Sequence, residues 1–229
     1  MNTLAEKINN AQDCLYNTNQ YELGCKYAQE AYMMNPDNLD AKYLYALALY
    51  LNGRCEEALK YFYELEKNNF DPYYFIYIAH CLCQTRTNLF LALKYINKLK
   101  RFYSHCDREA KIKILMIKAE IQYHMGYMDS ALNNFKKAYA MGDEDKSLCY
   151  ISQIYFDKNQ PMQAMKYLRK VLRFSEKDKE EFWKNMEKLT YKELKVTSII
   201  LLNRFEIEKN KKEVDLELYE SIQAKLYPE

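Results

Sequence analysis

The sequence has few of the residues that break helices or build small-molecule sites. Its 229 residues include only four glycines, four prolines and three histidines. Sheets joined by tight turns need many glycines and prolines, so their scarcity favours helices connected by short polar loops. The four glycines also lie too far apart to form a phosphate-binding loop. The composition therefore predicts an all-α protein without that kind of nucleotide site.

An excess of charge and a membrane segment are also missing. There are 34 basic and 32 acidic side chains, which gives a net charge of +2. Such a balance does not attract nucleic acid or an anionic membrane surface. The longest apolar run, residues 43–51, is too short to cross a bilayer. The first residues lack the layout of a signal peptide. We therefore expect neither a nucleic-acid partner nor a membrane association.

The cysteines and histidines do not show the spacing of a metal site. The cysteine count is odd, which is typical of reduced thiols and predicts a nuclear and cytoplasmic location. The densest group is His80, Cys81 and Cys83. The two cysteines would point about 200° apart on a helix, so a buried core role is favoured over a metal site. The seven cysteines are Cys14, Cys25, Cys55, Cys81, Cys83, Cys106 and Cys149.

One other pair has the elements of a nucleophile, His105 beside Cys106 in the stretch SHCD. A catalytic cysteine needs an orienting third group and an oxyanion site, and the surrounding sequence offers neither. An exposed loop is the better interpretation. We therefore predict that the chain is not an enzyme and uses no metal, cofactor or small-molecule substrate.

A repeat of about 34 residues is the strongest signal that is present. Small residues recur at steps of 34, 34, 39 and 33 residues, and apolar residues follow each at +1, +4 and +7. This spacing places them on one face of a helix. The repeating small residues are Gly24, Ala58, Ala92, Ala131 and Ala164.

Each of these helices has a predicted partner about twelve residues upstream. In the third repeat a shift of one residue fits better and places Ala79 and Leu82 on the partner's inner face. Glycine and asparagine tolerate the left-handed conformation that ends a helix. The unit is therefore helix, tight turn, helix. The predicted turns contain Asn19, Gly53, Thr87, Gly126 and Asn159.

This pattern resembles the tetratricopeptide repeat, in its period, in the stretch NGRCEEALKYFYEL at 52–65 and in Pro36 at the end of the first repeat. The resemblance implies a right-handed α-solenoid of about five repeats over residues 1–175. Residues 176–229 are then a degenerate repeat or capping helices, and a Thr190/Glu193 capping box starts one of them.

The resemblance also implies that the first helix of each repeat lines a concave groove. The groove positions of the second and third repeats are largely apolar, and we expect something to cover them because large apolar patches are rare on monomers. A partner chain is favoured, and C-terminal helices folding back are the alternative. The positions are Tyr43, Leu47, Tyr50, Tyr73 and Ile76.

The first 100 residues resemble more narrowly the N-terminal arms of the scaffold subunits of the anaphase-promoting complex. The likeness rests on an early Cys-Leu, an Ala-x-x-Ala second helix and a Leu/Ala-rich helix ending in Asn-Gly. It implies a homodimer in a ubiquitin ligase of mitosis and the cell cycle, bound to other subunits. Asn9 and Tyr16 would then enter the partner's groove. The alternative is a monomeric adaptor that binds an apolar peptide of another protein.

Overall fold

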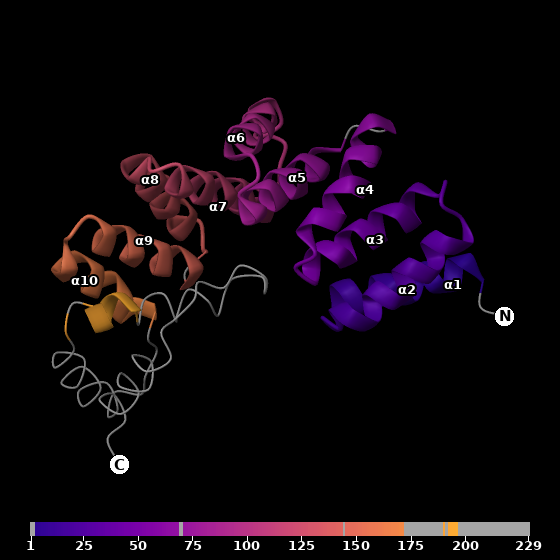
Figure 1. Cartoon of the computed structure of the whole chain (residues 1–229), viewed down its shortest axis with the longest axis horizontal. Coiled ribbons are helices and arrows are strands. Elements are labelled where there is room, and N and C mark those ends of the chain that lie inside the picture. Colours follow the sequence, from indigo (N-terminus) through magenta and orange to yellow (C-terminus); the bar gives the residue numbers. More distant parts are fainter. Residues whose placement is uncertain (1–2, 69–70, 144, 172–189, 191, 197–229) are drawn as a thin grey trace, which may run out of the picture. The chain divides into compact units, whose positions relative to one another are not determined.

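The computed structural model describes residues 3–68, 71–143, 145–171, 190 and 192–196. Within these ranges the regular elements are helices, and there is no β-strand. The all-α prediction is therefore confirmed. The chain divides between residues 117 and 118 into two compact units, and each is described by itself (Figure 1).

The first unit contains three helical hairpins and the start of a fourth. Consecutive helices pack against each other from α1 through α6. The first hairpin is α1 (Leu4–Gln12), the π-helical turn η1 (Asp13–Asn17) and α2 (Tyr21–Met34). The second is α3 (Leu39–Leu51) with α4 (Cys55–Asn68). The third is α5 (Pro72–Thr85), α6 (Leu89–Lys98) and the 3₁₀ turn η2 (Leu99–Arg101).

The second unit continues the same pattern. Helix α7 (Arg108–His124) begins in the first unit and ends in the second, where α8 (Met128–Ala140), α9 (Asp145–Asp157) and α10 (Pro161–Val171) follow. A further helical stretch covers residues 192–196. Its predicted capping box is confirmed, because Glu193 N donates to Thr190 Oγ1 at 3.4 Å and Thr190 N donates to Glu193 Oε2 at 2.7 Å. The helices predicted at 177–188 and 213–227 lie outside the described residues.

Short polar side chains start the helices of the first unit. Thr3 and Glu6 form the predicted capping box, in which Thr3 N donates to Glu6 Oε2 at 2.7 Å. Asn38 Oδ1 accepts from Ala41 N at 2.8 Å, and Asn88 Oδ1 accepts from Leu91 N at 2.9 Å. Each oxygen satisfies one of the amide groups that a helix start leaves without a partner. Local sequence therefore sets where these helices begin.

The turns follow the predicted positions in four of the five hairpins. Asn19, Gly53, Gly126 and Asn159 have positive φ angles of 54°, 73°, 82° and 57°. In the third hairpin the left-handed residue is Arg86, with a φ of 54°, one position before the predicted Thr87.

The third hairpin is displaced because α5 starts early. Asp71 caps it by accepting from Tyr73 N at 2.8 Å, and Pro72 occupies its first turn. Proline is well suited there, since its missing amide would have had no partner. Pro72 thus begins a helix, whereas Pro36 lies in the loop after α2. The turn at Arg86 agrees with the one-residue shift predicted for this repeat, whereas burial does not separate the two registers, since Ala79, His80, Leu82 and Cys83 are all buried.

The core lies between the paired helices, and the small residues allow them to approach. Gly24 and the four repeating alanines are buried. In the fifth hairpin the approach is close enough for Ser152 Oγ to donate to the carbonyl oxygen of Ala164 at 3.1 Å. Large rings fill the remaining space. Phe62 stacks on Tyr77 with centroids 5.1 Å apart, and Phe135 stacks on Tyr150 at 4.5 Å.

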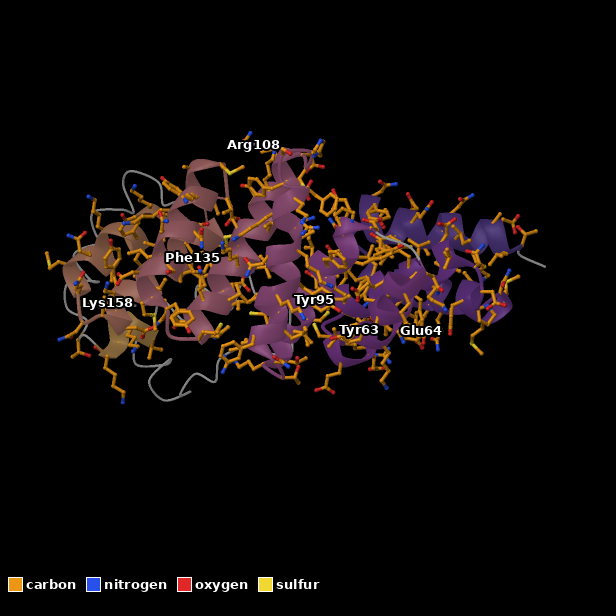
Figure 2. All side chains as sticks on the ribbon, turned by 90° about the horizontal axis from the view of Figure 1, so that it is seen from above. Tyr63, Glu64, Tyr95, Arg108, Phe135 and Lys158 are labelled. Carbon is orange, nitrogen blue, oxygen red and sulfur yellow. The ribbon has the colours of Figure 1, made fainter. Side chains whose placement is uncertain are left out.

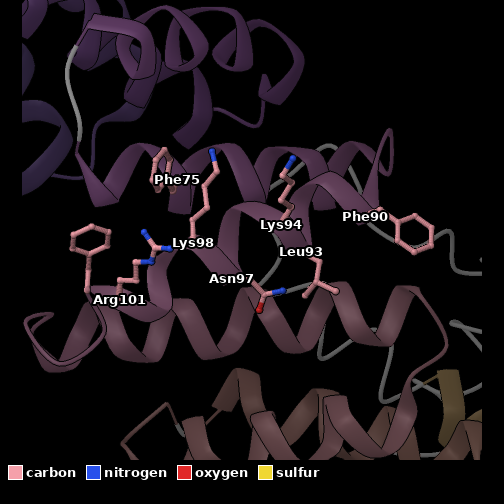
Figure 3. Close-up of a pocket in the computed structure, with 8 residues that line it drawn as sticks. Phe75, Phe90, Leu93, Lys94, Asn97, Lys98 and Arg101 are labelled. Carbon is pink, nitrogen blue, oxygen red and sulfur yellow. The ribbon is translucent and has the colours of Figure 1, made fainter.

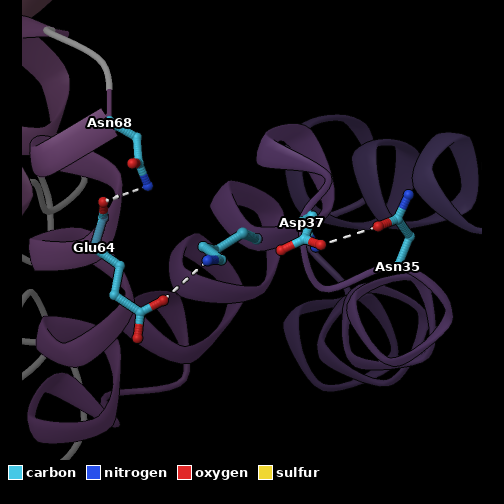
Figure 4. Close-up of polar contacts among 5 residues, drawn as sticks. Asn35, Asp37, Glu64 and Asn68 are labelled. Atoms are coloured by element: carbon cyan, nitrogen blue, oxygen red, sulfur yellow. Dashed lines mark hydrogen bonds and ion pairs between the residues drawn. The ribbon is translucent and has the colours of Figure 1, made fainter.

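Polar contacts tie neighbouring helices together at the edges of the core. Lys42 Nζ of α3 forms an ion pair with Glu64 Oε2 of α4 at 2.9 Å (Figure 4). Between the second and third hairpins, Tyr95 Oη donates to Glu66 Oε2 at 2.7 Å, and the ring of Tyr95 lies 6.3 Å from that of Tyr63 (Figure 2). Each bond links helices that are close in sequence, as expected of a repeat architecture.

Candidate protein-binding face

The predicted groove residues lie on α3 and α5, the first helices of their hairpins, but they differ in exposure. Leu47 and Ile76 are each only 2% exposed within one chain. These two side chains are therefore already covered within one chain, without a partner. Tyr43 and Tyr50 are half-buried, and Tyr73 is exposed. The accessible part of this surface is thus aromatic and hydroxyl-bearing rather than aliphatic.

Tyr16 lies against this surface in its own chain. It belongs to η1, and its hydroxyl lies close enough to that of Tyr43 to affect its pKa, as does the hydroxyl of Tyr77 in α5. The rings of Tyr43 and Tyr77 are 6.5 Å apart. Burial raises the pKa of Tyr43, and the neighbouring hydroxyls raise it further. Three consecutive hairpins therefore contribute one tyrosine each to a connected group.

Buried polar side chains form a hydrogen-bonded network with Tyr50 of the same surface. Tyr50 Oη lies 2.7 Å from His80 Nδ1, and His80 Nε2 lies 3.1 Å from Gln84 Nε2. The rings of Tyr50 and Tyr77 are 5.0 Å apart. Both His80 and Gln84 are buried, which confirms the core role predicted for His80 and excludes it as an exposed ligand. The network fixes the Tyr50 ring in one orientation.

We call the surface formed by Tyr16, Tyr43, Tyr50, Tyr73 and Tyr77 the tyrosine face. At its far end Tyr73 Oη donates to Asp107 Oδ2 at 3.3 Å. Asn9, the other residue predicted to reach a partner, is exposed on α1. Tyrosine offers a large apolar area together with a polar tip, which is the combination found at protein interfaces. The aromatic rings of this surface can pack against apolar groups, and its hydroxyl groups can form hydrogen bonds with a ligand.

Tyr77 is the member of this face that sequence reasoning missed. The signal was present, because Tyr77 follows Tyr43 by 34 residues and Tyr50 follows Tyr16 by the same step. The shifted register of the third repeat drew attention to Tyr73 and Ile76 instead.

In the second unit, charged and polar side chains make contacts between the first helices of neighbouring hairpins. The fully buried Glu120 of α7 forms an ion pair with Lys146 Nζ of α9 at 2.7 Å. Tyr123 Oη donates to Asp157 Oδ2 at 2.7 Å, and Lys195 Nζ lies 2.8 Å from Asp157 Oδ1. An ion pair and a hydrogen bond therefore link α7 to α9 in this unit.

The cysteines play the structural role that was predicted for the His80 group. Cys81 and Cys83 are fully buried in α5, and burial raises the pKa of the Cys81 thiol next to Cys55. Cys106 lies in a turn, where its Sγ donates to the Phe102 carbonyl at 3.3 Å. Among the described residues no three metal-binding side chains cluster, and no helix there has the length and apolarity needed to cross a membrane.

Comparison with known proteins connects this architecture to solved structures. No protein-family model matches the chain, and neither does any curated protein. The structure resembles TTC0263, a thermophilic TPR protein of Thermus thermophilus, with a TM-score of 0.57 and 13% identity over 98% of this chain and 99% of that one. It also resembles the MamA RS-1 ArsTM double mutant, with a TM-score of 0.56 and 16% identity over 75% of this chain and 94% of that one.

At such low identity the likeness shows the fold alone. The chain has the all-α helical-repeat fold of tetratricopeptide-repeat proteins, as its sequence predicted. This fold is one of stacked helical hairpins that provide extended binding surfaces.

Proposed function

We propose that the chain is a non-catalytic scaffold that binds a segment of another polypeptide across the tyrosine face. The observation that carries this function is the face itself, where three consecutive hairpins bring five tyrosines together. Tyr16 and Tyr73 present exposed rings, and the other three rings are partly covered. Aromatic anchors of this kind dominate the energy of many protein interfaces.

The hydrogen bonds of the face make it ready to bind. Immobilising a side chain on binding costs about 0.5–1.5 kcal/mol. Tyr50 and Tyr73 are already held by hydrogen bonds to His80 and Asp107. A partner that docks here loses little free energy to ordering these rings.

The first proposed occupant is a second copy of the chain. The sequence resemblance to the arms of the anaphase-promoting complex supports it, as do the exposed Asn9 and Tyr16 at the N-terminal edge of the face. The chain would then be a homodimeric subunit of a nuclear and cytoplasmic ubiquitin ligase, in contact with other protein subunits. A two-fold contact would use the same patch on both copies.

The second proposed occupant is a segment of a different protein, bound by a monomer. The burial of Leu47 and Ile76 within one chain favours this alternative. With those side chains covered, the isolated chain exposes no aliphatic stripe along α3 and α5 that association must bury.

The mass of the purified chain in solution separates the two occupants. Light scattering at about micromolar concentration should give twice the chain mass for the homodimer. Tyr16→Glu should weaken a dimer about tenfold or more, because it places a charge in the contact. The matched control is Tyr127→Glu in the second unit, since Tyr16 is 54% and Tyr127 53% exposed. Leu47→Glu is a poor test, because a charge at that buried position would unfold the helix pair.

A monomeric wild-type chain would remove the homodimer and leave the adaptor. The adaptor then has to select peptides from a displayed library, and Tyr16→Glu, but not Tyr127→Glu, should lose them. A monomer whose selected peptides bind both variants equally would contradict the proposed function.

A further inference from the structure

A cavity of about 670 Å³ lies on the third hairpin, apart from the tyrosine face. Its wall is one stripe of α6 and η2, at spacings typical of a single helix face, with one ring from α5 (Figure 3). We call it the basic pocket, and its lining residues are Phe75, Phe90, Leu93, Lys94, Asn97, Lys98, Arg101 and Phe102.

The pocket lies next to the loop that makes the third repeat longer than the others. The step from Ala92 to Ala131 is 39 residues, against 33 or 34 elsewhere. After η2 the chain forms a turn closed on the Phe102 carbonyl, which accepts from His105 N at 2.9 Å and from Cys106 N at 3.2 Å. This turn holds Arg101 and Phe102 at the end of the α6 stripe.

The pocket carries three cations and its lining contains no carboxylate. Lys98 is partly compensated by Glu66, with Nζ 3.4 Å from Oε1, and its ammonium group lies 4.9 Å from the Phe75 ring centroid. Lys94 and Arg101 form no ion pair with any residue that the structure describes. Two positive charges in one hollow therefore have no acidic partner there.

An aromatic anchor point lies beside these charges. Phe90 is 75% exposed at the start of the stripe, and the half-buried Leu93 lies next to it on the same helix face. An exposed phenylalanine beside free cations is suited to a ligand that combines an apolar side chain with negative charge.

We infer that the basic pocket binds a short acidic peptide of another protein. An apolar side chain of the peptide packs on Phe90 and Leu93, and its carboxylates pair with Lys94 and Arg101. Arginine binds carboxylates through two parallel hydrogen bonds, and Asn97 adds an amide group for the peptide backbone. We choose an acidic peptide as the ligand because its negative charge complements the positive charge of the pocket.

A peptide fits the charge pattern better than nucleic acid. Binding along a phosphate backbone needs a continuous basic track, whereas these cations end within one hairpin of a chain whose net charge is +2. This site is independent of the tyrosine face, so Tyr16→Glu should leave it unchanged.

The test uses the full chain and a fluorescein-labelled peptide of sequence EDEFEDE, followed by fluorescence anisotropy. We expect saturable binding with a dissociation constant below about 100 μM. Lys94→Glu with Arg101→Glu should weaken it at least about tenfold. The matched control is Lys26→Glu with Lys60→Glu, which makes the same charge change at exposed positions of the same unit outside the pocket.

The apolar contact is tested separately. Phe90→Ser should weaken binding of EDEFEDE about tenfold but should hardly affect EDESEDE, which lacks the ring. Met33→Ser is the control, because Met33 is 72% exposed. The inference is overturned if EDEFEDE does not bind, or if it binds the Lys94/Arg101 variant as tightly as wild type. It is also overturned if this variant loses an oligonucleotide but not the peptide.

Discussion

At the scale of single residues, the missing Cβ of Gly24 allows α2 to pack closely against η1. A Cβ built there would lie 2.7 Å from Leu15 Cδ2 and 3.1 Å from Cys14 Cβ. Both neighbours are buried, so they have little room to move. The glycine is therefore required by packing, although alanine would be the better helix former by about 1 kcal/mol.

We predict that Gly24→Ala destabilises the chain by about 1–3 kcal/mol in urea unfolding, because overpacking outweighs the gain in helix propensity. Leu15→Ala alone should also destabilise it by leaving a cavity. The double variant should lose less than the two single losses added together, since the shortened side chain makes room for the new methyl group. Strict additivity would show that the two residues are not in tight contact.

The raised pKa of Tyr77 predicts that the folded chain loses stability in alkaline solution. Burial raises its pKa from 10.0 to about 12. Because the folded chain holds this proton more tightly, its contribution to stability is complete below about pH 10 and is lost as the pH rises through about 12. The free energy of unfolding should therefore fall over that window, and less steeply in Tyr77→Phe. The exposed Tyr127→Phe serves as the control. Equal slopes in all three proteins would contradict this.

At the scale of helices, the small residues that recur along the chain decide how closely each pair packs. Ala58 and Ala131 are fully buried in α4 and α8, while Ala140 is exposed at the end of α8. We predict that Ala58→Trp and Ala131→Trp each lower the free energy of unfolding by about 3 kcal/mol, because a ring forces the helices apart. Ala140→Trp should change it by less than about 0.5 kcal/mol. Melting temperatures equal to wild type for the buried variants would mean that the repeat register is wrong.

Several helix starts were predicted correctly from the local sequence. In the third hairpin, however, the position of the turn was predicted one residue too late. Thr3 with Glu6 and Thr190 with Glu193 act as caps because each needs only residues three positions away. The turn at Arg86 was placed one residue late, since the Asp71 cap and Pro72 start α5 before the repeat period does. Here a local cap took precedence over the average period.

At the scale of the molecule, each described unit is held together by contacts between neighbouring hairpins. Tyr73 bonds to Asp107 in the first unit and Tyr123 to Asp157 in the second, each across 34 residues. A fold built this way has a stability that is close to a sum of repeat and nearest-neighbour terms.

The sequence by itself determined the repeat, the helix pairs, four of the five turns and the buried role of His80, Cys81 and Cys83. These features depend on periodicity and capping, which act over one repeat or less, so a linear reading contains them. The resemblance to the tetratricopeptide fold followed from the same features.

Only the tertiary structure decided which groove residues are accessible. Leu47 and Ile76 have the spacing of groove residues, yet both are buried within the chain. Tyr16 was expected to reach a partner, and its hydroxyl lies near that of Tyr43 in its own chain. The longer third repeat was visible as a 39-residue step, but the pocket lined by Phe90, Lys94 and Arg101 was not. Exposure and pockets depend on how several helices come together in space, and one-dimensional spacing does not specify that arrangement.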